Sequence, residues 1–258
     1  MISVCLTTYN GAAYIEPQLN SILCQLTEGD EIVVSDDASS DDTLLVVSRV
    51  MQRAPQGICM RIVHNEGEHG YTANFENALR QAKGDYIFLS DQDDVWLPGK
   101  VACMVKALEA DKRHLLAVCN ARITDSQLNV TADDYYKARG VYQGLLGNLY
   151  KFGYLGCCMA MRRELLHTAL PFPKNRSYCV HDNWLFLCAQ IHHRGVVIIS
   201  KPLMLYRRHS ATCTTGAKNA HKPTSFRIRY RLYLVGQLIS RLVTHTPVSP
   251  ATSEQHSI

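Results

Sequence analysis

The sequence predicts an α/β protein with a mostly parallel, Rossmann-like central sheet and helices on both of its faces. Two observations support this fold class. Through the first half of the chain, short apolar runs alternate with longer segments of helical periodicity, and strands that alternate with helices at this spacing form parallel sheets. In addition, 47% of the 258 residues are hydrophobic and only 19% are charged, so a substantial core is expected.

Four strands and four helices are expected in the first half, in strict alternation. The strands are short apolar runs bounded by glycine, proline or polar residues, and they cover Ile2–Thr7, Glu31–Ser35, Met60–His64 and Tyr86–Ser90. The helices carry apolar residues three and four positions apart, and they cover Ala13–Cys24, Asp42–Met51, Thr72–Ala82 and Pro98–Glu109. Ser39 and Ser40 precede the second helix, and Pro98 suits the first turn of the fourth.

The second half of the chain is less regular. Strands are expected at Leu116–Cys119, Cys157–Met161 and Val196–Ser200, and helices at Asp182–Ile191 and Phe226–Val243. Neither a repeat nor a low-complexity linker interrupts the chain. We therefore expect one domain over residues 1–216, followed by a basic helical extension with a loose tail over residues 217–258.

The net charge of +4 conceals an uneven distribution. Asp182 is the last carboxylate before Glu254, and every Lys and Arg between them adds to a basic stretch. These basic residues are Arg194, Lys201, Arg207, Arg208, Lys218, Lys222, Arg227, Arg229, Arg231 and Arg241. A basic C-terminal third indicates an anionic partner, for which a diphosphate, anionic lipid headgroups and nucleic acid are the alternatives.

Apolar runs and cysteines indicate the compartment. No apolar run has the length of a membrane span, and no basic leader precedes the first strand, so we expect a cytoplasmic protein. Several of the ten cysteines lie in apolar segments, and none forms a C-x-x-C pair. This placement favours reduced thiols over a disulfide framework or a zinc site.

An acidic loop, Asp91-Gln92-Asp93-Asp94, follows the fourth expected strand. Its carboxylates lie at the carboxyl end of that strand, which is where open α/β sheets bind their ligands. Carboxylates this close repel one another unless a cation or an array of donors neutralises them, and oxygen ligands suit Mg²⁺ and Mn²⁺. A solvated acidic turn with a helix cap is the alternative, and the motif alone does not decide between the two.

Polar residues also follow the first and second expected strands. Thr7-Thr8-Tyr9-Asn10-Gly11 offers hydroxyls, an aromatic ring and a flexible glycine, although a turn capped by asparagine would have the same composition. Asp37 follows the second strand, where acidic residues of nucleotide-binding folds accept hydrogen bonds from the ligand. The alternative is a helix cap, which Ser39 or Ser40 could supply without Asp37.

Taken together and in this order, the motifs resemble the signatures of family 2 glycosyltransferases. The segments that carry the resemblance are Thr7–Asn10, Asp36–Asp41, Asn65–Asn74 and Ser90–Pro98. The last segment is similar to the bacterial rhamnosyltransferase-like branch, which builds cell-surface polysaccharide. The resemblance covers residues 2–216, and it implies the GT-A fold, a nucleotide-diphospho-sugar donor and a divalent cation.

In the first half, the resemblance implies roles for five residues. Thr7 and Tyr9 match positions that hold the nucleobase, Tyr9 by stacking, and Asp37 matches the carboxylate that reads the base. Asp91 matches a residue near the ribose and the diphosphate. Asp93 matches the metal ligand of the D-x-D motif, so Mn²⁺ or Mg²⁺ is expected there.

In the second half, the resemblance implies a catalytic base and further donor contacts. Asp182 matches the base, while Arg207 and His209 match a segment that approaches the donor diphosphate. An inverting transfer does need a carboxylate that takes the acceptor proton, and cations that meet the leaving diphosphate. A helix cap is the alternative for Asp182, and a surface position is the alternative for His209. Asn120 departs from the family pattern, because an acidic residue is common there.

We therefore expect an inverting, metal-dependent glycosyltransferase that transfers a hexosyl or deoxyhexosyl unit, such as rhamnosyl, to a saccharide or lipid-linked saccharide. One rival is a sugar nucleotidyltransferase, which would need a basic phosphate loop after the first strand, but Thr8–Ala13 contains no basic residue. The other rival is a basic nucleic-acid-binding module. We expect no nucleic acid as a partner, because the acidic strand ends would repel phosphate in the absence of a metal.

The helix expected at Phe226–Val243 combines apolar residues at helical spacing with several arginines. A basic amphipathic helix can lie on an anionic membrane surface, and a position at the inner face of the cytoplasmic membrane would suit a lipid-linked acceptor. Alternatively, the helix packs on the domain and leaves its arginines in solvent. The sequence slightly favours packing.

Overall fold

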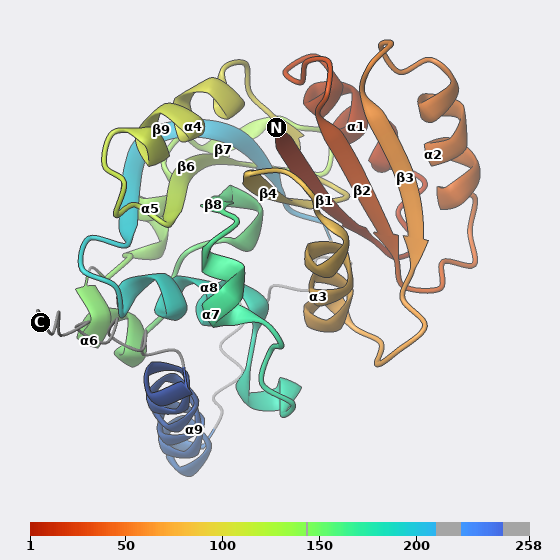
Figure 1. Cartoon of the computed structure of the whole chain (residues 1–258). Coiled ribbons are helices and arrows are strands. Elements are labelled where there is room, and N and C mark those ends of the chain that lie inside the picture. Colours follow the sequence, from red (N-terminus) through yellow and green to blue (C-terminus); the bar gives the residue numbers. More distant parts are fainter. Residues whose placement is uncertain (143, 210–222, 245–258) are drawn as a thin grey trace, which may run out of the picture.

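Strands β1 to β9 form one mixed sheet in the structure, a computed structural model that describes residues 1–142, 144–209 and 223–244 (Figure 1). Neighbouring strands follow the order β3-β2-β1-β4-β8-β6-β9-β5, and β7 pairs with β6 off this path. The predicted α/β class is confirmed. The sheet is parallel through its first half and mixed in its second.

The first half of the chain supplies the parallel part of the sheet. Its strands are β1 (Ile2–Thr8), β2 (Glu31–Asp36), β3 (Cys59–His64) and β4 (Tyr86–Asp91). Its helices are α1 (Ile15–Leu23), α2 (Thr43–Gln52), α3 (Tyr71–Gln81) and α4 (Lys100–Glu109). The chain moves outward from β1 to β3 and then returns to the far side of β1, so right-handed crossovers place α3 on the opposite face from α1 and α2 (Figure 1).

The second half adds antiparallel neighbours. Its strands are β5 (Val95–Trp96), β6 (Leu116–Thr124), β7 (Val130–Ala132), β8 (Met159–Arg162) and β9 (Val196–Arg207). Strand β8 is antiparallel to both β4 and β6, whereas β9 is parallel to β6. Strand β5 pairs with the end of β9 in antiparallel fashion, Val95 with Leu205 and Trp96 with Met204. The segment just after the acidic loop is therefore joined to the last strand of the sheet.

The expected strand at Cys157–Met161 is partly wrong. The strand begins at Met159, because Gly156–Cys158 form a 3-10 turn, η1. Apolar composition alone does not separate such a turn from the strand that follows it.

Strands β6 and β9 are both longer than expected. They continue beyond Cys119 and Ser200, the points at which their apolar runs end, and the register between them shifts around Asn120. The buried Asn120 amide donates to the Ser200 carbonyl (3.1 Å) and to Asp134 (2.8 Å). A polar residue can therefore lie inside the strand without leaving its amide donors unsatisfied.

The remaining helical elements are α5 (Tyr135–Arg139), α6 (Gly144–Tyr150), α7 (Leu165–Ala169), η2 (Arg176–Tyr178), α8 (His181–Gln190) and α9 (Thr224–Thr244). Helices α8 and α9 are confirmed. Helix α8 is buried along most of its length, and its Trp184, Leu185 and Phe186 belong to the core. Because α8 is surrounded by the core, it is apolar on more than one face.

Helix α9 packs beside α8 and keeps a second apolar face exposed (Figure 1). Leu234 and Leu238 are buried against the domain. The exposed face carries Ile228, Leu232, Val235, Ile239, Leu242 and Val243. Among the described residues, none of the helices combines the length and the apolar character that a membrane crossing requires. The expected loose tail lies mostly beyond Thr244, outside the described residues.

Candidate active site

The carboxyl ends of β1, β2 and β4 meet at one edge of the sheet. Thr7 lies in register with Ser35 on β2 and with Asp91 on β4. Thr7 therefore lies between the ends of β2 and β4, and it is nearly buried there. The parallel topology therefore brings together three of the strand ends that the sequence singled out.

Gln92 joins the loop after β1 to the acidic loop, a role that no pattern in the sequence indicated. Its Oε1 accepts hydrogen bonds from the Thr8 hydroxyl (2.6 Å) and the Tyr9 N–H (2.9 Å). Its Nε2 donates to the Tyr9 carbonyl (3.0 Å). Gly11 lies so close that a Cβ at this position would overlap the Gln92 amide. A side chain at Gly11 would therefore displace the Gln92 amide from its contacts with the first loop.

A cavity of about 240 Å³ lies beside the ends of β1 and β2, and it is lined by Tyr9, Asp37, Ala38 and His69. The Tyr9 ring is 57% exposed, so its face is free to take a planar ligand. Asp37 accepts hydrogen bonds from Asn65 Nδ2 (2.7 Å) and Gly70 N–H (2.7 Å), and its carboxylate lies 2.9 Å from His69 Nδ1. Burial would raise the pKa of Asp37, but these three hydrogen-bond partners lower it overall. Asp37 is therefore a fixed, charged acceptor at the cavity wall.

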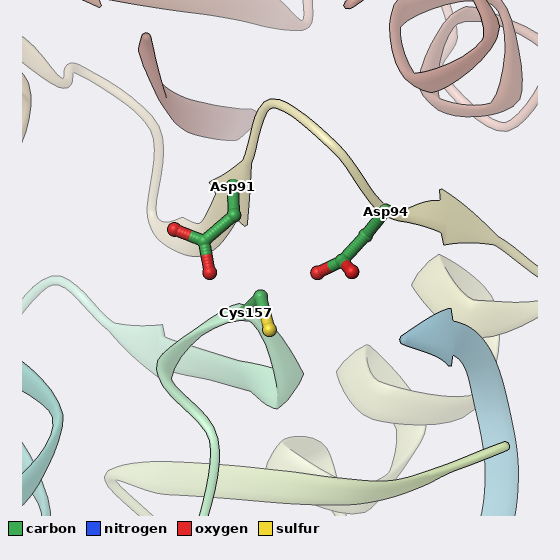
Figure 2. Close-up of side chains that lie close together, drawn as sticks. All are labelled: Asp91, Asp94 and Cys157. Atoms are coloured by element: carbon green, nitrogen blue, oxygen red, sulfur yellow. The ribbon is translucent and has the colours of Figure 1, made fainter. Parts of the chain in front are cut away.

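Asp91 and Asp94 point from the acidic loop toward Cys157 on η1 (Figure 2). One ligand atom from each of the three residues lies within 4.8 Å of the others. Asp94 is fully buried, and its Oδ1 accepts the Arg207 N–H at 3.0 Å, whereas its Oδ2 has no hydrogen-bond partner among the residues that the structure describes. A buried carboxylate oxygen without a donor favours a cation beside it.

The charge state of these carboxylates also fits a divalent cation. Burial and the charge of Asp93 raise the pKa of Asp91 to about 7. Burial and the charges of Asp93 and Asp91 raise the pKa of Asp94 well above its usual value. A divalent cation would offset this repulsion, and carboxylate oxygens are the ligands that Mn²⁺ and Mg²⁺ prefer.

Cys157 is a poor ligand for such an ion. A hydrogen bond with Cys158 lowers the pKa of the Cys157 thiol, but burial and the charges of Asp94 and Asp91 raise it well above its usual value. Mn²⁺ and Mg²⁺ also prefer oxygen ligands to sulfur.

Asp93, the metal ligand that the sequence predicted, lies outside the group of Asp91, Asp94 and Cys157. Its carboxylate is 2.8 Å from His209 Nε2, and the His209 ring stacks on Tyr14 with 4.7 Å between ring centroids. The His209 side chain is 11% exposed, which argues against the surface position considered for it. The structure thus brings Asp93 and His209 together.

Arg207 donates hydrogen bonds to the acidic loop and to a neighbouring loop. Its Nε donates to the Asp93 carbonyl (2.7 Å) and its Nη1 donates to the Ser126 carbonyl (2.6 Å). The residue is 6% exposed, and its guanidinium lies 5.0 Å from the centre of the Tyr14 ring. These contacts position the loop, and a direct contact of Arg207 with donor phosphates remains a prediction.

Asp182 is the second residue of α8, not its cap, because Val180 occupies the N-cap position. Its Oδ1 accepts the N–H of Asn183 at 2.6 Å. Burial raises the pKa of Asp182 to about 7. Helix α8 packs on η1, whose Cys157 lies beside Asp91 and Asp94, and the charge of Asp182 contributes to the raised pKa of Asp91. A carboxylate with a pKa near neutrality, next to the acidic loop, is suited to accept a proton.

Gly156 lies between this part of α8 and the acidic loop. A Cβ at Gly156 would clash with the imidazole of His181 and would lie 3.3 Å from Asp182 Cβ. In sequence, Gly156-Cys157-Cys158-Met159 resembles an acceptor-side strand of the family, although packing alone would explain its composition. Asn120, the departure from the family pattern, is used inside the sheet, where its side chain bonds Asp134 and the Ser200 carbonyl.

Two curated relatives share parts of this sequence. The dTDP-rhamnosyl transferase RfbG of Shigella flexneri is 28% identical over 222 residues, which cover 79% of this chain and 71% of the relative. The UDP-Glc:alpha-D-GlcNAc-diphosphoundecaprenol beta-1,3-glucosyltransferase WfaP of Escherichia coli is 30% identical over 112 residues, which cover 43% of each chain.

Solved structures share the whole fold. S. aureus TarS in complex with UDP-GlcNAc matches with a TM-score of 0.64 at 17% identity, covering 95% of this chain and 73% of that one. The mannosyltransferase PcManGT of Pyrobaculum calidifontis, in complex with GDP-Man and Mn²⁺, matches with a TM-score of 0.61 at 20% identity, covering 94% of this chain and 74% of that one. These matches confirm the GT-A fold expected from the sequence.

A family model matches a large part of this chain. The model for glycosyl transferase family 2 matches residues 3–170, which include β1 through α7 and the acidic loop. That range is more than half of the 258 residues. The chain belongs to glycosyl transferase family 2.

Proposed function

We propose that this enzyme transfers a hexosyl or deoxyhexosyl unit, rhamnosyl foremost, from a nucleotide-diphospho-sugar to a saccharide or lipid-linked saccharide, with inversion at the anomeric carbon. The observation that carries the proposal is the Asp182 carboxylate, whose pKa is raised to about 7 beside the acidic loop. The rhamnosyl unit is supported by the similarity to a dTDP-rhamnosyl transferase. A lipid-linked acceptor is supported by the name of the diphosphoundecaprenol-dependent relative.

The donor would lie across the ends of β1, β2 and β4. Its base would stack on Tyr9 and donate to Asp37, in the cavity that these residues line. A divalent cation, Mn²⁺ or Mg²⁺, would be held by the acidic loop. Its ligands would be Asp93, as the sequence predicted, together with Asp91 and Asp94, whose ligand atoms lie within 4.8 Å of each other. When bound, that cation supplies positive charge to the departing diphosphate. His209 is the Asp93 partner, so it lies on the same side.

Asp182 would take the proton of the acceptor hydroxyl. The oxygen then forms its bond to the anomeric carbon, while the bond from that carbon to the diphosphate oxygen breaks and the diphosphate leaves with the electron pair. The proton ends on the Asp182 carboxylate, so the step balances without any further reactant. A group with a pKa of about 7 is matched to this task, because it is partly deprotonated at neutral pH and still basic enough to accept.

Helix α9 would hold the enzyme at the anionic inner surface of the cytoplasmic membrane. Its exposed apolar face and the exposed Arg227 and Arg229 support this placement. Family membership disfavours both rivals, since neither a nucleotidyltransferase nor a nucleic-acid-binding module belongs to this family.

A donor screen tests the proposal most directly. Nucleotide-diphospho-sugars with different bases and sugars are added with Mn²⁺, and both the melting temperature and slow hydrolysis of the sugar nucleotide are measured. We expect one donor to raise the melting temperature, and EDTA to remove the effect. If no nucleotide-sugar stabilises the protein, or if stabilisation survives excess EDTA, the metal-dependent donor site is wrong.

A further inference from the structure

A second cavity lies behind the base-carrying helix. It has a volume of about 230 Å³ and is enclosed by α6, α8 and α9 with the segment that follows α6. Four aromatic residues contribute to its lining: Tyr150, Phe152, Phe226 and Tyr230. Phe226 and Tyr230 stack with 6.4 Å between ring centroids, which leaves an aromatic surface rather than separate rings. A cavity with aromatic walls and few polar groups is a typical small-molecule site.

Two arginines give this cavity a positive charge. Arg231 donates to the carbonyl of Leu149 (2.8 Å), to that of Arg227 (3.1 Å) and to that of Tyr150. All three acceptors are neutral. Arg227 is exposed, and its guanidinium has no hydrogen bond or ion pair within the described parts of the chain. None of the lining residues is a carboxylate, so both charges are available to an anion such as a phosphate.

The cavity reaches α8 at the residue that follows the proposed base, Asp182. Asn183, which also lines it, follows Asp182 in α8 and donates from Nδ2 to the Tyr230 hydroxyl at 2.5 Å. Asn183 is 3% exposed, and its side-chain amide oxygen, Oδ1, has no hydrogen-bond partner among the described residues. Burial raises the pKa of Tyr230, and the charge of Asp182 adds to that shift, so Tyr230 is close to Asp182 as well.

We propose that this cavity is the acceptor site and that the acceptor is a saccharide carried on a phosphate or diphosphate. The sugar ring would lie against the aromatic walls, with a hydroxyl toward Asp182, and the phosphate would face Arg227 and Arg231. A neutral oligosaccharide would leave both arginine charges unused. This inference rests on the proposed glycosyltransferase function and specifies the acceptor of the same site.

The test compares two arginines that lie two residues apart on α9. Arg227 lines the cavity, whereas Arg229 is also exposed and does not line it. The probes are N-acetylglucosamine linked through a diphosphate to a short alkyl chain, N-acetylglucosamine 1-phosphate, and the uncharged octyl glycoside. Binding is measured by calorimetry in EDTA, so that a cation in the donor site does not capture the diphosphate.

We expect Arg227→Gln to weaken binding of the diphosphate probe about tenfold, as loss of a charge-assisted hydrogen bond does. Binding of the octyl glycoside should be unchanged in this variant. The matched variant, Arg229→Gln, removes the same charge from the same helix and should change the affinity less than about twofold. Tighter binding of the alkyl-linked probe would identify a lipid-linked acceptor, and equal binding of the 1-phosphate would identify a free sugar phosphate.

Two outcomes would overturn the acceptor site. One is an equal loss of affinity in both variants, which would mean diffuse attraction to a basic helix. The other is unchanged affinity in Arg227→Gln. Nucleotide binding with Mn²⁺ is measured in the same proteins, because its absence in the wild type would reject the proposed function itself. Intact nucleotide binding together with either outcome would reject the acceptor site alone.

Discussion

At the scale of single residues, Asp182 as the proposed base predicts how the reaction depends on pH. Burial raises its pKa to about 7, so the carboxylate is protonated below this pH and cannot act as a base. We expect kcat/KM to rise with pH through about 7 and then to level off. The profile is measured at saturating Mn²⁺, because a bound cation lowers the pKa of Asp91. A profile that is flat from pH 5.5 upward would contradict the assignment of the base.

Replacing Asp182 with asparagine should separate turnover from binding. Asp182→Asn keeps the shape of the side chain but cannot accept a proton, so kcat should fall by about 10²–10⁴. Donor binding should be unchanged. The free energy of unfolding of this variant at pH 8 should equal or exceed that of the wild type. Burial disfavours the charged form of Asp182 in the folded wild type, so the stabilising contribution of its protonated form is lost as pH rises through about 7.

The matched control is Asp133→Asn, since the Asp133 side chain is 83% exposed and lies in the loop after β7. This variant should retain the wild-type kcat. Should Asp182→Asn transfer sugar at the wild-type rate, the base lies elsewhere, and the assignments in the second half of the chain must be withdrawn.

The cation is tested by two substitutions, one in the acidic loop and one on η1. Asp93→Ala should abolish transfer and weaken Mn²⁺-dependent nucleotide binding at least about tenfold, because a charged ligand is removed. Cys157→Ala should leave Mn²⁺ affinity nearly unchanged, since Mn²⁺ prefers oxygen ligands to sulfur. Titration with Mn²⁺, followed by calorimetry, checks both. A fully active Asp93→Ala would shift the cation to Asp91 and Asp94, whose carboxylates face each other near Cys157 (Figure 2).

At the scale of elements, η1 fixes the position of the base at the start of α8. A Cβ at Gly156 would clash with His181, whose ring is buried and lies 4.1 Å from the Phe75 ring. Gly156→Ala should therefore displace the start of α8 and lower kcat about tenfold or more, with a smaller effect on donor binding.

Gly153→Ala is the control for this substitution. A Cβ at Gly153 would meet Val141 Cγ2 at 3.4 Å, which is an ordinary contact. This variant should keep both its kcat and its melting temperature. If Gly156→Ala has wild-type turnover, the spacing between η1 and α8 does not matter for the base.

The elements also show how far local sequence patterns reach. Every boundary of β1–β4 and α1–α4 lies within two residues of the prediction, because each strand is a separate apolar run and each helix has one apolar face. In β6 and β9 the apolar runs stop at Cys119 and Ser200, yet both strands continue because Asn120 finds partners across the register shift. Such partners are distant in sequence, so periodicity cannot show them.

The candidate site follows the same rule. The acidic loop, Asp37 and Asp182 stand out because they occur, in order, in motifs that resemble those of family 2 glycosyltransferases, whereas each alone could be a turn or a helix cap. The contacts of Gln92 and Gly156 were not predicted, since they depend on side chains that come close only in the fold. The pairing of Asp93 with His209 spans 116 residues, which no local pattern predicts.

At the scale of the whole molecule, the exposed face of α9 should bind an anionic membrane. Vesicles with phosphatidylglycerol should sediment with the protein, whereas vesicles of phosphatidylcholine alone should not. The double substitution Leu232→Gln with Ile239→Gln should reduce the bound fraction about tenfold or more, because the two side chains are 67% and 55% exposed and would enter the lipid.

A single change on another helix controls for a general effect of lost hydrophobicity. Leu45 on α2 is 49% exposed, and Leu45→Gln should leave vesicle binding unchanged. Equal binding to neutral and anionic vesicles, or no binding to either, would leave α9 as a packed helix only, which is the alternative that the sequence slightly favoured.

The pairing of β5 with β9 has a consequence for how the enzyme is made. Protein synthesis delivers β1 through β4 and the acidic loop first, but the segment after that loop finds its partner strand only when Met204 and Leu205 emerge. Arg207, which donates hydrogen bonds to Asp93 and Asp94 of that loop, is synthesised later still. A nascent chain should thus present a sheet with nucleotide-facing loops long before it has a finished cation site. Catalytic competence would then arrive late and abruptly during translation, which keeps incomplete chains from consuming sugar nucleotides on the ribosome.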